Sequence, residues 1–134
     1  YPGMAELLEQ ARRKGYQLMM ATSKPEVFAR KILDHFQLAA YFSFVGGATL
    51  DGVRSTKEEV IDYVLKTNEV VSLSEVIMVG DRKFDILGAK HAGVSSVGCV
   101  YGYGSREEFT ENGADYQIET VEELVDFLMK WGEV

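Results

Sequence analysis

Two aspartates stand at a spacing that suits metal chemistry in the stretch Val76–Gly93, VIMVGDRKFDILGAKHAG. Asp81 directly follows an apolar run, and Asp85 comes four residues later, which is about one helical turn. Oxygen ligands of this kind bind hard divalent cations, so we expect Asp81 and Asp85 to hold Mg²⁺. The local alternative is that Asp81 is a turn residue and Asp85 caps the following helix.

Three further residues carry groups that bind anions. Thr22 and Ser23 follow the apolar run Tyr16–Ala21, and a hydroxyl with backbone N–H groups at a helix start binds an oxyanion. Lys57 stands in the first turn of another predicted helix, where the helix dipole disfavours a cation unless an anion lies near. A hydroxyl, an ammonium and Mg²⁺ around one point would form a phosphoryl-binding site. The local alternatives are that Thr22 and Ser23 cap the helix beginning at Pro25, and that Lys57 is solvated.

The elements that would position these residues alternate between apolar strands and amphipathic helices. The predicted strands are Tyr16–Ala21, Tyr41–Gly47, Glu75–Gly80, Ser95–Gly102 and an edge strand at Tyr116–Glu119. The predicted helices are Met4–Lys14, Ser23–Phe36, Ser55–Thr67, Asp85–His91, a short helix from Ser105, and Thr120–Trp131. This alternation predicts an α/β fold, with a Rossmann-like parallel sheet and helices on both faces. The polar residues that follow each strand should then meet at one edge of the sheet.

Local signals sharpen some of these elements. The third helix begins with two overlapping capping boxes, Ser55 with Glu58 and Thr56 with Glu59. The stretch Tyr101–Ser105, YGYGS, offers glycines for a tight loop near the site. We interpret Arg54 and Lys24 as ordinary surface cations, with a substrate contact as the alternative for Lys24. The histidines have no partner pattern, and neither is proposed as a ligand.

Composition excludes several classes of partner. The 134 residues carry 14 Lys and Arg against 21 Asp and Glu, a net charge of −7, and such a chain repels nucleic acid and anionic lipid. No apolar run approaches the roughly 18 residues of a membrane span, and no signal peptide is recognisable. The single cysteine, Cys99, cannot form an intramolecular disulfide. We therefore expect a cytoplasmic protein with no nucleic-acid or membrane partner.

Three segments in order carry a family resemblance. They are LMMATSKP (Leu18–Pro25), RSTKEEVI (Arg54–Ile61) and IMVGDRKFDILGAKHAG (Ile77–Gly93). Together they resemble the haloacid dehalogenase superfamily of phosphohydrolases, closest to its phosphoglycolate phosphatase-like branch. The resemblance places Thr22 in the second family motif, Lys57 in the third, and Gly80–Asp85 in the fourth.

The resemblance also exposes an absence, because family members begin with an Asp-x-Asp-Gly-Thr motif whose first aspartate is the nucleophile. This chain has no Asp-x-Asp. We therefore expect residues 1–134 to be the C-terminal part of the family's core domain, without the first strand or the helical cap and with no second domain. The missing strand would lie between the strands ending at Ala21 and Gly80. The parent polypeptide or another chain would supply it, or these two strands would close up and pair directly.

The resemblance implies a Mg²⁺-dependent phosphomonoester hydrolase that acts on a small phosphorylated metabolite. Thr22 and the Ser23 N–H would hold the phosphoryl oxygens, and Lys57 would stabilise the nucleophile and the phosphoryl charge. Asp81 would ligate Mg²⁺, and Asp85 would bind it or orient Lys57. Phosphoglycolate is the first substrate expected, and a nucleoside 5′-monophosphate is the alternative.

Two rival classes remain beside this enzyme. Without a nucleophile, these 134 residues alone could act as a non-catalytic binding module. A phosphoaspartate receiver domain shares the sheet type, but it needs an acid pair near the N-terminus that the sequence lacks.

Overall fold

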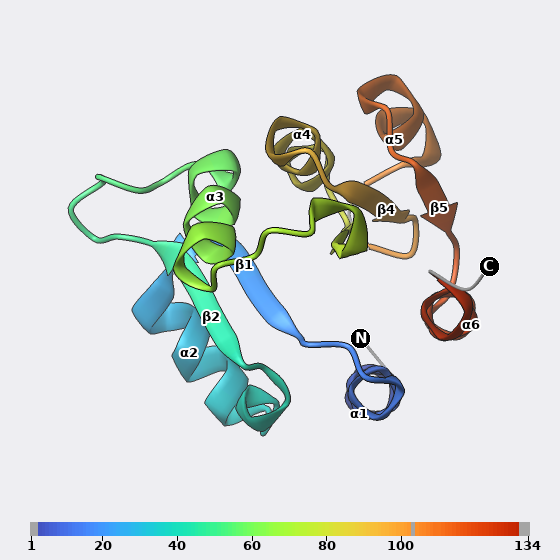
Figure 1. Ribbon diagram of the computed structural model, residues 1–134, viewed down its shortest axis with the longest axis horizontal. Coiled ribbons are helices and arrows are strands. Elements are labelled where there is room, and N and C mark those ends of the chain that lie inside the picture. Colours follow the sequence, from blue (N-terminus) through green and yellow to red (C-terminus); the bar gives the residue numbers. More distant parts are fainter. Residues whose placement is uncertain (1–2, 103, 132–134) are drawn as a thin grey trace. The chain divides into compact units, whose positions relative to one another are not determined.

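The computed structural model describes residues 3–102 and 104–131 (Figure 1). The chain divides into two compact units, and each is described by itself. The first unit is Gly3–Glu69, and the second unit begins at Val70. Both units are α/β in architecture, as the alternation of strands and helices predicts.

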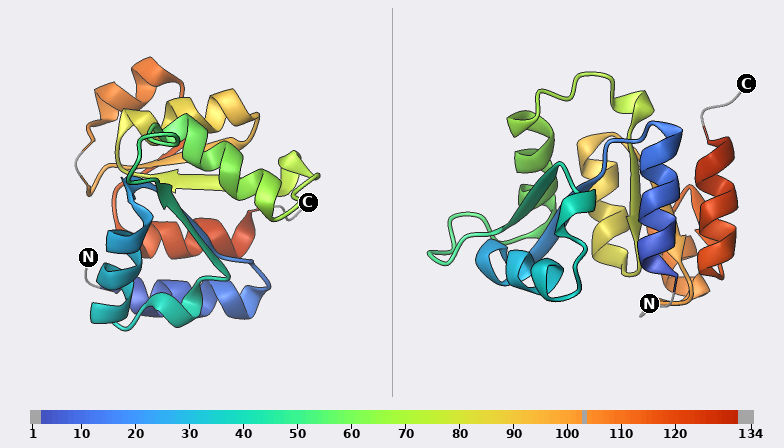
Figure 2. Two further views of the ribbon diagram at one scale, coloured as in Figure 1. Left: turned by 90° about the vertical axis from the view of Figure 1, so that its left-hand side faces the viewer. Right: turned by 90° about the horizontal axis from the view of Figure 1, so that it is seen from below.

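The first unit is built on two parallel strands, β1 (Met19–Pro25) and β2 (Phe44–Ala48). In their register, Met19 lies opposite Phe44 and Ala21 opposite Gly46. The helices α2 and α3 cover opposite faces of this strand pair (Figure 2). The helices of this unit are α1 (Met4–Lys14), α2 (Glu26–His35), the short 3₁₀ helix η1 (Ala39–Tyr41) and α3 (Lys57–Thr67).

The core of the first unit forms where α2 and α3 pack on β1 and β2. Its buried residues from these elements are Ala29, Leu33, Val45, Ala48, Val60, Ile61 and Val64. The approach of α3 requires a glycine in β2, because a Cβ atom at Gly46 would lie 2.4 Å from a methyl group of Val64. Apolar spacing along α3 thus fixes which face of the helix meets the sheet.

The second unit has three parallel strands in the order β3-β4-β5. Its elements are η2 (Leu73–Glu75), β3 (Ile77–Gly80), α4 (Lys83–Ala92), β4 (Ser95–Cys99), α5 (Arg106–Asn112), β5 (Tyr116–Ile118) and α6 (Val121–Lys130). Within this unit, α4 and α6 lie on opposite faces of the sheet (Figure 2). Its fully buried side chains include Ile86, Val97, Phe109 and Leu124.

Each predicted strand and helix is present, and the largest boundary difference falls at Thr22–Pro25. The sequence predicts a helix from Ser23, whereas β1 continues to Pro25 and α2 begins at Glu26. Two local effects explain the difference. The Thr22 hydroxyl accepts the backbone N–H of Lys24 at 3.1 Å, and the residue before a proline disfavours helical dihedrals.

The interpretation of Thr22 and Ser23 as helix caps is therefore wrong. The N-cap of α2 is Pro25, with no side-chain capping bond.

The strands β1 and β3 are edge strands of their sheets, each with a hydrogen-bonded neighbour on one side. Among the described residues, β1 pairs with β2 and β3 pairs with β4, in two separate sheets. The direct pairing of β1 with β3, one of the three expected outcomes, would join the two units and stays a prediction. None of the helices in residues 3–102 and 104–131 has the length and apolar character needed to cross a bilayer.

Candidate functional site

Within the first unit, Lys57 contacts β1 at Ala21, the last residue before the pairing of β1 with β2 becomes irregular. Its Nζ donates a hydrogen bond to the carbonyl oxygen of Ala21 at 2.8 Å. Thr22 is the next residue along the chain, so the ammonium and the hydroxyl-bearing segment meet at one edge of the strand pair. The rule that polar residues gather beyond parallel strand ends accounts for this meeting.

The position of Lys57 depends on how α3 begins. Thr56 is the N-cap: its hydroxyl accepts the Glu59 N–H at 3.2 Å, and the Glu59 carboxylate accepts the Thr56 N–H at 3.0 Å. Of the two capping boxes that the sequence allows, the one formed by Thr56 and Glu59 is therefore the one that forms. These hydrogen bonds lower the pKa of Glu59 below its usual value. Lys57 is then the first residue of the helix.

Arg54 has a role that sequence reasoning missed. Its Nε donates to the carbonyl oxygen of Gly47 at 2.8 Å, and its guanidinium stacks 3.6 Å from the centre of the Tyr63 ring. The Arg54 Nη2 lies 3.7 Å from Glu26 Oε1, and its side chain is only 19% exposed. The interpretation of Arg54 as an ordinary surface cation is wrong, because its partners come from three separate elements that no local pattern could reveal.

Asp85 builds the turn between β3 and α4 in the second unit. The side chain is 6% exposed, and its Oδ2 accepts the backbone N–H groups of Asp81 at 3.0 Å and Arg82 at 3.2 Å. A Cβ at Gly80 would lie 2.2 Å from the Asp85 side chain, so the carboxylate folds back over this glycine. The local interpretation of Asp85 as a helix-capping residue is confirmed by these hydrogen bonds.

Asp81 is half-buried beside the loop that follows β4. A Cβ at Gly102 would lie 2.4 Å from the Asp81 side chain, so a glycine of the YGYGS loop does lie near this residue; Tyr103 of the same loop is outside the described residues. Burial, together with the charges of Asp81 and Asp85, raises the pKa of Cys99 to about 11, against the lowering effect of a hydrogen bond from Tyr101. Both carboxylates thus act on the end of β4.

Glu108 of α5 is a second residue that the sequence pattern did not reveal. Its Oε2 accepts the backbone N–H of Lys83 at 2.9 Å and lies 3.5 Å from the Arg82 guanidinium. Sequence analysis could identify Glu108 only as a first-turn acid of a helix capped by Ser105. The contact adds a second carboxylate to the start of α4, where the helix dipole favours negative charge.

The structure brings the predicted residues together in two groups. In the first unit Lys57 contacts Ala21, which precedes Thr22 and Ser23 in the chain. In the second, Asp85 accepts the backbone N–H of Asp81. One site made of both groups stays a prediction. Within residues 3–102 and 104–131, no three His, Cys, Asp or Glu side chains gather as a metal would require. The two aspartates alone fit part of an oxygen-ligand set for Mg²⁺.

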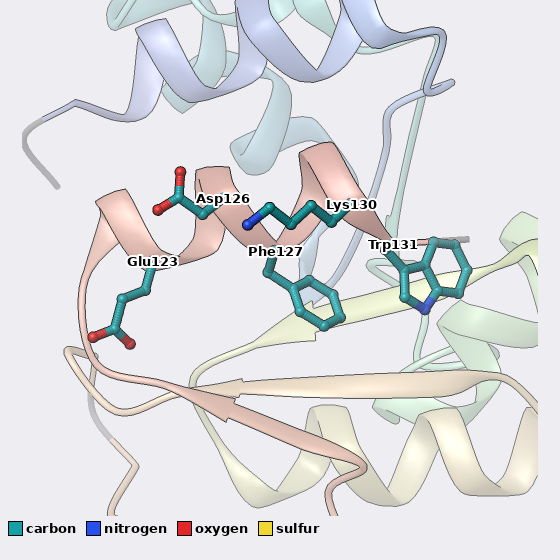
Figure 3. A pocket seen from close by; sticks show the side chains of 5 residues that line it. All are labelled: Glu123, Asp126, Phe127, Lys130 and Trp131. Carbon is teal, nitrogen blue, oxygen red and sulfur yellow. The ribbon is translucent and has the colours of Figure 1, made fainter. Parts of the chain in front are cut away.

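A hollow on α6 lies away from these residues in the sequence and contains none of them. Figure 3 shows the side chains that line it, all from α6 and the residue after it. They are Glu123, Asp126, Phe127, Lys130 and Trp131. The Phe127 ring packs against Tyr116 of β5, with ring centres 4.8 Å apart. We interpret this surface as helix-to-strand packing.

Comparison with known proteins adds an independent finding. The family described as haloacid dehalogenase-like hydrolase matches residues 1–99. A 5′-nucleotidase of Pseudomonas aeruginosa is 44% identical over 108 residues, which are 81% of this chain and 48% of that protein. A phosphoglycolate phosphatase of Vibrio parahaemolyticus is 32% identical over 126 residues, which are 94% of this chain and 55% of that protein.

A solved structure agrees with these matches. A predicted phosphatase from Clostridium acetobutylicum superposes with a TM-score of 0.94 and 42% identity, over 97% of this chain and 60% of that one. The chain spans about half the length of the curated relatives that it matches. The family match, the relatives and the shared α/β fold lead to one conclusion: the chain belongs to the haloacid dehalogenase-like hydrolase family.

Proposed function

We propose that this chain is the C-terminal part of the core of a cytoplasmic, Mg²⁺-dependent phosphomonoester hydrolase. The observation that carries the proposal is the hydrogen bond from Lys57 Nζ to the Ala21 carbonyl oxygen, at 2.8 Å. It holds an ammonium against β1, at the residue that precedes Thr22 in the chain. The phosphatases and nucleotidase among the relatives support the same chemistry.

The first unit would bind the phosphoryl group. The Thr22 hydroxyl and the Ser23 N–H would orient its oxygens, and Lys57 would neutralise the charge that grows on them in the transition state. Lys57 is also the first residue of α3, so the positive end of the helix dipole adds to its ammonium charge. Both effects favour binding of a phosphoryl dianion over the dephosphorylated alcohol product.

The second unit would contribute to the metal site. Asp81 would be a ligand, and Asp85, whose Oδ2 is bonded to the backbone of residues 81 and 82, would hold the turn and offer its other oxygen. Bound Mg²⁺ would supply positive charge at the phosphoryl oxygens. Two carboxylates are fewer than such a site needs, so a further ligand would come from outside this chain.

The nucleophile would also come from outside residues 1–134, since the sequence has no Asp-x-Asp. The strands β1 and β3 each have one hydrogen-bonded neighbour in their sheets, and this supports a strand partner on their other side. An unpaired buried backbone group costs about 1–3 kcal/mol, so a partner strand would stabilise both units. The parent polypeptide or another chain would provide that strand.

The substrate would be a small phosphorylated metabolite. Phosphoglycolate is the first candidate from the sequence motifs, and a relative with this activity in its name covers 94% of the chain. A nucleoside 5′-monophosphate is the second candidate, because the 5′-nucleotidase relative has the higher identity, 44%. Comparing kcat/KM for both compounds decides between them.

The test uses the full-length polypeptide that contains this chain. Its intact mass is measured, and p-nitrophenyl phosphate hydrolysis is then followed with Mg²⁺ and with chelator. We expect Mg²⁺-dependent turnover that is lost in Lys57→Ala and Asp81→Asn but kept in Lys66→Ala, an exposed lysine on the same helix. Absence of turnover in a folded, full-length protein would contradict the proposal and favour a non-catalytic binding module.

A further inference from the structure

The six residues Thr49–Arg54, which precede α3 in the chain, form a loop that closes on itself. The Thr49 N–H donates to the Arg54 carbonyl oxygen at 2.8 Å, and the Arg54 N–H returns to the Thr49 hydroxyl at 2.9 Å. Inside the loop, the Asp51 carboxylate accepts the Val53 N–H at 3.0 Å, and Gly52 takes a φ of +80°. The loop therefore has a defined shape, and Arg54 stands at its closing end.

The Arg54 side chain ties this loop to the rest of the first unit. It bonds to the Gly47 carbonyl oxygen at the end of β2, and it stacks on Tyr63 in the body of α3. Its Nη2 also lies 3.7 Å from Glu26 Oε1 at the start of α2, and the same carboxylate oxygen accepts the Gly47 N–H at 3.3 Å. One guanidinium thus connects β2, α2 and α3.

These connections bear directly on Lys57. Arg54 lies three residues before Lys57, and the Tyr63 ring that it contacts belongs to the helix that Lys57 begins. Glu26 begins the helix that follows Thr22 and Ser23 in the chain. The contacts of Arg54 thus join α2 and α3, the two helices that begin next to the Lys57–Ala21 hydrogen bond.

We propose that Arg54 is a positioning residue that holds Lys57 against Ala21 of β1. The inference rests on the proposed phosphatase function, and Arg54 acts through Lys57 without touching substrate. The planar guanidinium suits this task because it can stack and donate in its plane at once. A lysine at position 54 would keep the charge but lose the stacked, directional contact.

A double-mutant cycle in the full-length protein tests the inference. We expect Arg54→Ala to lower kcat on the order of 10- to 100-fold, with a smaller change in KM, because displacing a catalytic group by about 1 Å has an effect of this size. In a Lys57→Ala background, where there is no ammonium left to position, Arg54→Ala should leave the residual kcat unchanged. Arg54→Lys should restore part of the lost activity.

Arg30 gives a matched control. It lies 3.8 Å from the other oxygen of Glu26 and donates to the Val45 carbonyl oxygen, but its contacts among the described residues include neither Gly47 nor Tyr63, which Arg54 joins. Arg30→Ala should leave kcat within about two-fold of the wild type. Thermal unfolding of each variant separates a loss of folded protein from a loss of turnover.

A second readout follows Lys57 without any activity. Acetylation of lysines in the native protein is measured by mass spectrometry, with the exposed Lys66 as the internal reference. Arg54→Ala should raise the Lys57 rate several-fold relative to Lys66, and Arg30→Ala should not. This measurement remains informative if the first variant lowers stability.

The outcomes separate the two proposals. If Arg54→Ala lowers kcat equally with and without Lys57, or leaves Lys57 acetylation unchanged, the positioning role is overturned while the phosphatase stands. If the wild type has no turnover or Lys57→Ala leaves kcat unchanged, the proposed function fails first. Loss of the Arg54 effect in the Lys57→Ala background supports both.

Discussion

Asp85 Oδ2 lies 3.0 Å from the backbone nitrogen of Asp81 and accepts its hydrogen bond. Asp85, which the motif predicts as a metal ligand, therefore also builds the turn that carries Asp81, the other predicted ligand. A variant that removes the Asp85 side chain would confuse these two roles. The pair Asp85→Asn and Asp85→Ala separates them.

We expect Asp85→Asn to keep most of the stability and to lose metal affinity. The asparagine carbonyl can still accept the Asp81 and Arg82 N–H groups, but it has no charge for a cation. Asp85→Ala should lower the free energy of unfolding by about 1–3 kcal/mol, because two backbone N–H groups lose their partner. Urea unfolding measures stability, and the Mg²⁺ concentration for half-maximal turnover of the full-length protein measures the metal role. Equal stability loss in both variants would contradict the capping assignment.

Much of the fold could be predicted because its signals are local. Met4–Lys14 is helical as predicted, and Gly15 ends it with a φ of +108°. The contact of Lys57 with the β1 segment before Thr22 could also be predicted, because site residues of parallel sheets gather toward the carboxyl ends of the strands.

The rest depends on contacts that a linear pattern does not encode. Thr22–Pro25 stays extended because a hydroxyl-to-backbone bond and a proline compete with the helix signal. Arg54 and Glu108 find their partners in elements distant in the sequence. One site formed by both groups of residues stays a prediction, and no pattern within either unit encodes it.

The capping box of α3 predicts a pH dependence. Hydrogen bonds from Thr56 hold the pKa of Glu59 below its usual 4.5, so the folded state favours the charged carboxylate. Its contribution to stability is complete above pH 4.5 and is lost as the pH falls through the lower, folded-state pKa. Glu59→Gln should therefore lose less stability than the wild type on acidification, measured by urea unfolding at pH 7 and pH 3.5. An unchanged wild-type dependence in Glu59→Gln would contradict the contribution of the capping box.

The close contact of β2 with α3 predicts that any residue larger than glycine at position 46 destabilises the protein. Gly46→Ala should destabilise the protein by about 1–3 kcal/mol, because the new Cβ would lie 2.4 Å from a Val64 methyl group. The double variant Gly46→Ala/Val64→Ala should recover part of this loss, since the clashing methyl is gone. Thermal or urea unfolding of the wild type, both single variants and the double variant measures the coupling. Additive effects of the two substitutions would contradict the contact.

The pKa of the Cys99 thiol depends in part on the charge of Asp81. Burial, together with the carboxylates of Asp81 and Asp85, raises the pKa of the thiol from its usual 9.0 to about 11. Because the folded-state pKa is the higher one, the folded protein retains the proton between pH 9 and 11; the associated stability is complete below pH 9 and is lost as the pH rises through 11.

At pH 8 the native thiolate fraction should be about 100-fold below that of the unfolded chain. The midpoint of the pH profile of iodoacetamide alkylation measures this shift in pKa. Steric shielding of the thiol would lower the alkylation rate at every pH without moving the midpoint. Asp81→Asn removes one of the charges that raise the pKa, so its midpoint should move to lower pH. Asp126→Asn makes the same charge change on α6 and should leave the midpoint in place; equal shifts in the two variants would show that Asp81 has no special proximity to the thiol.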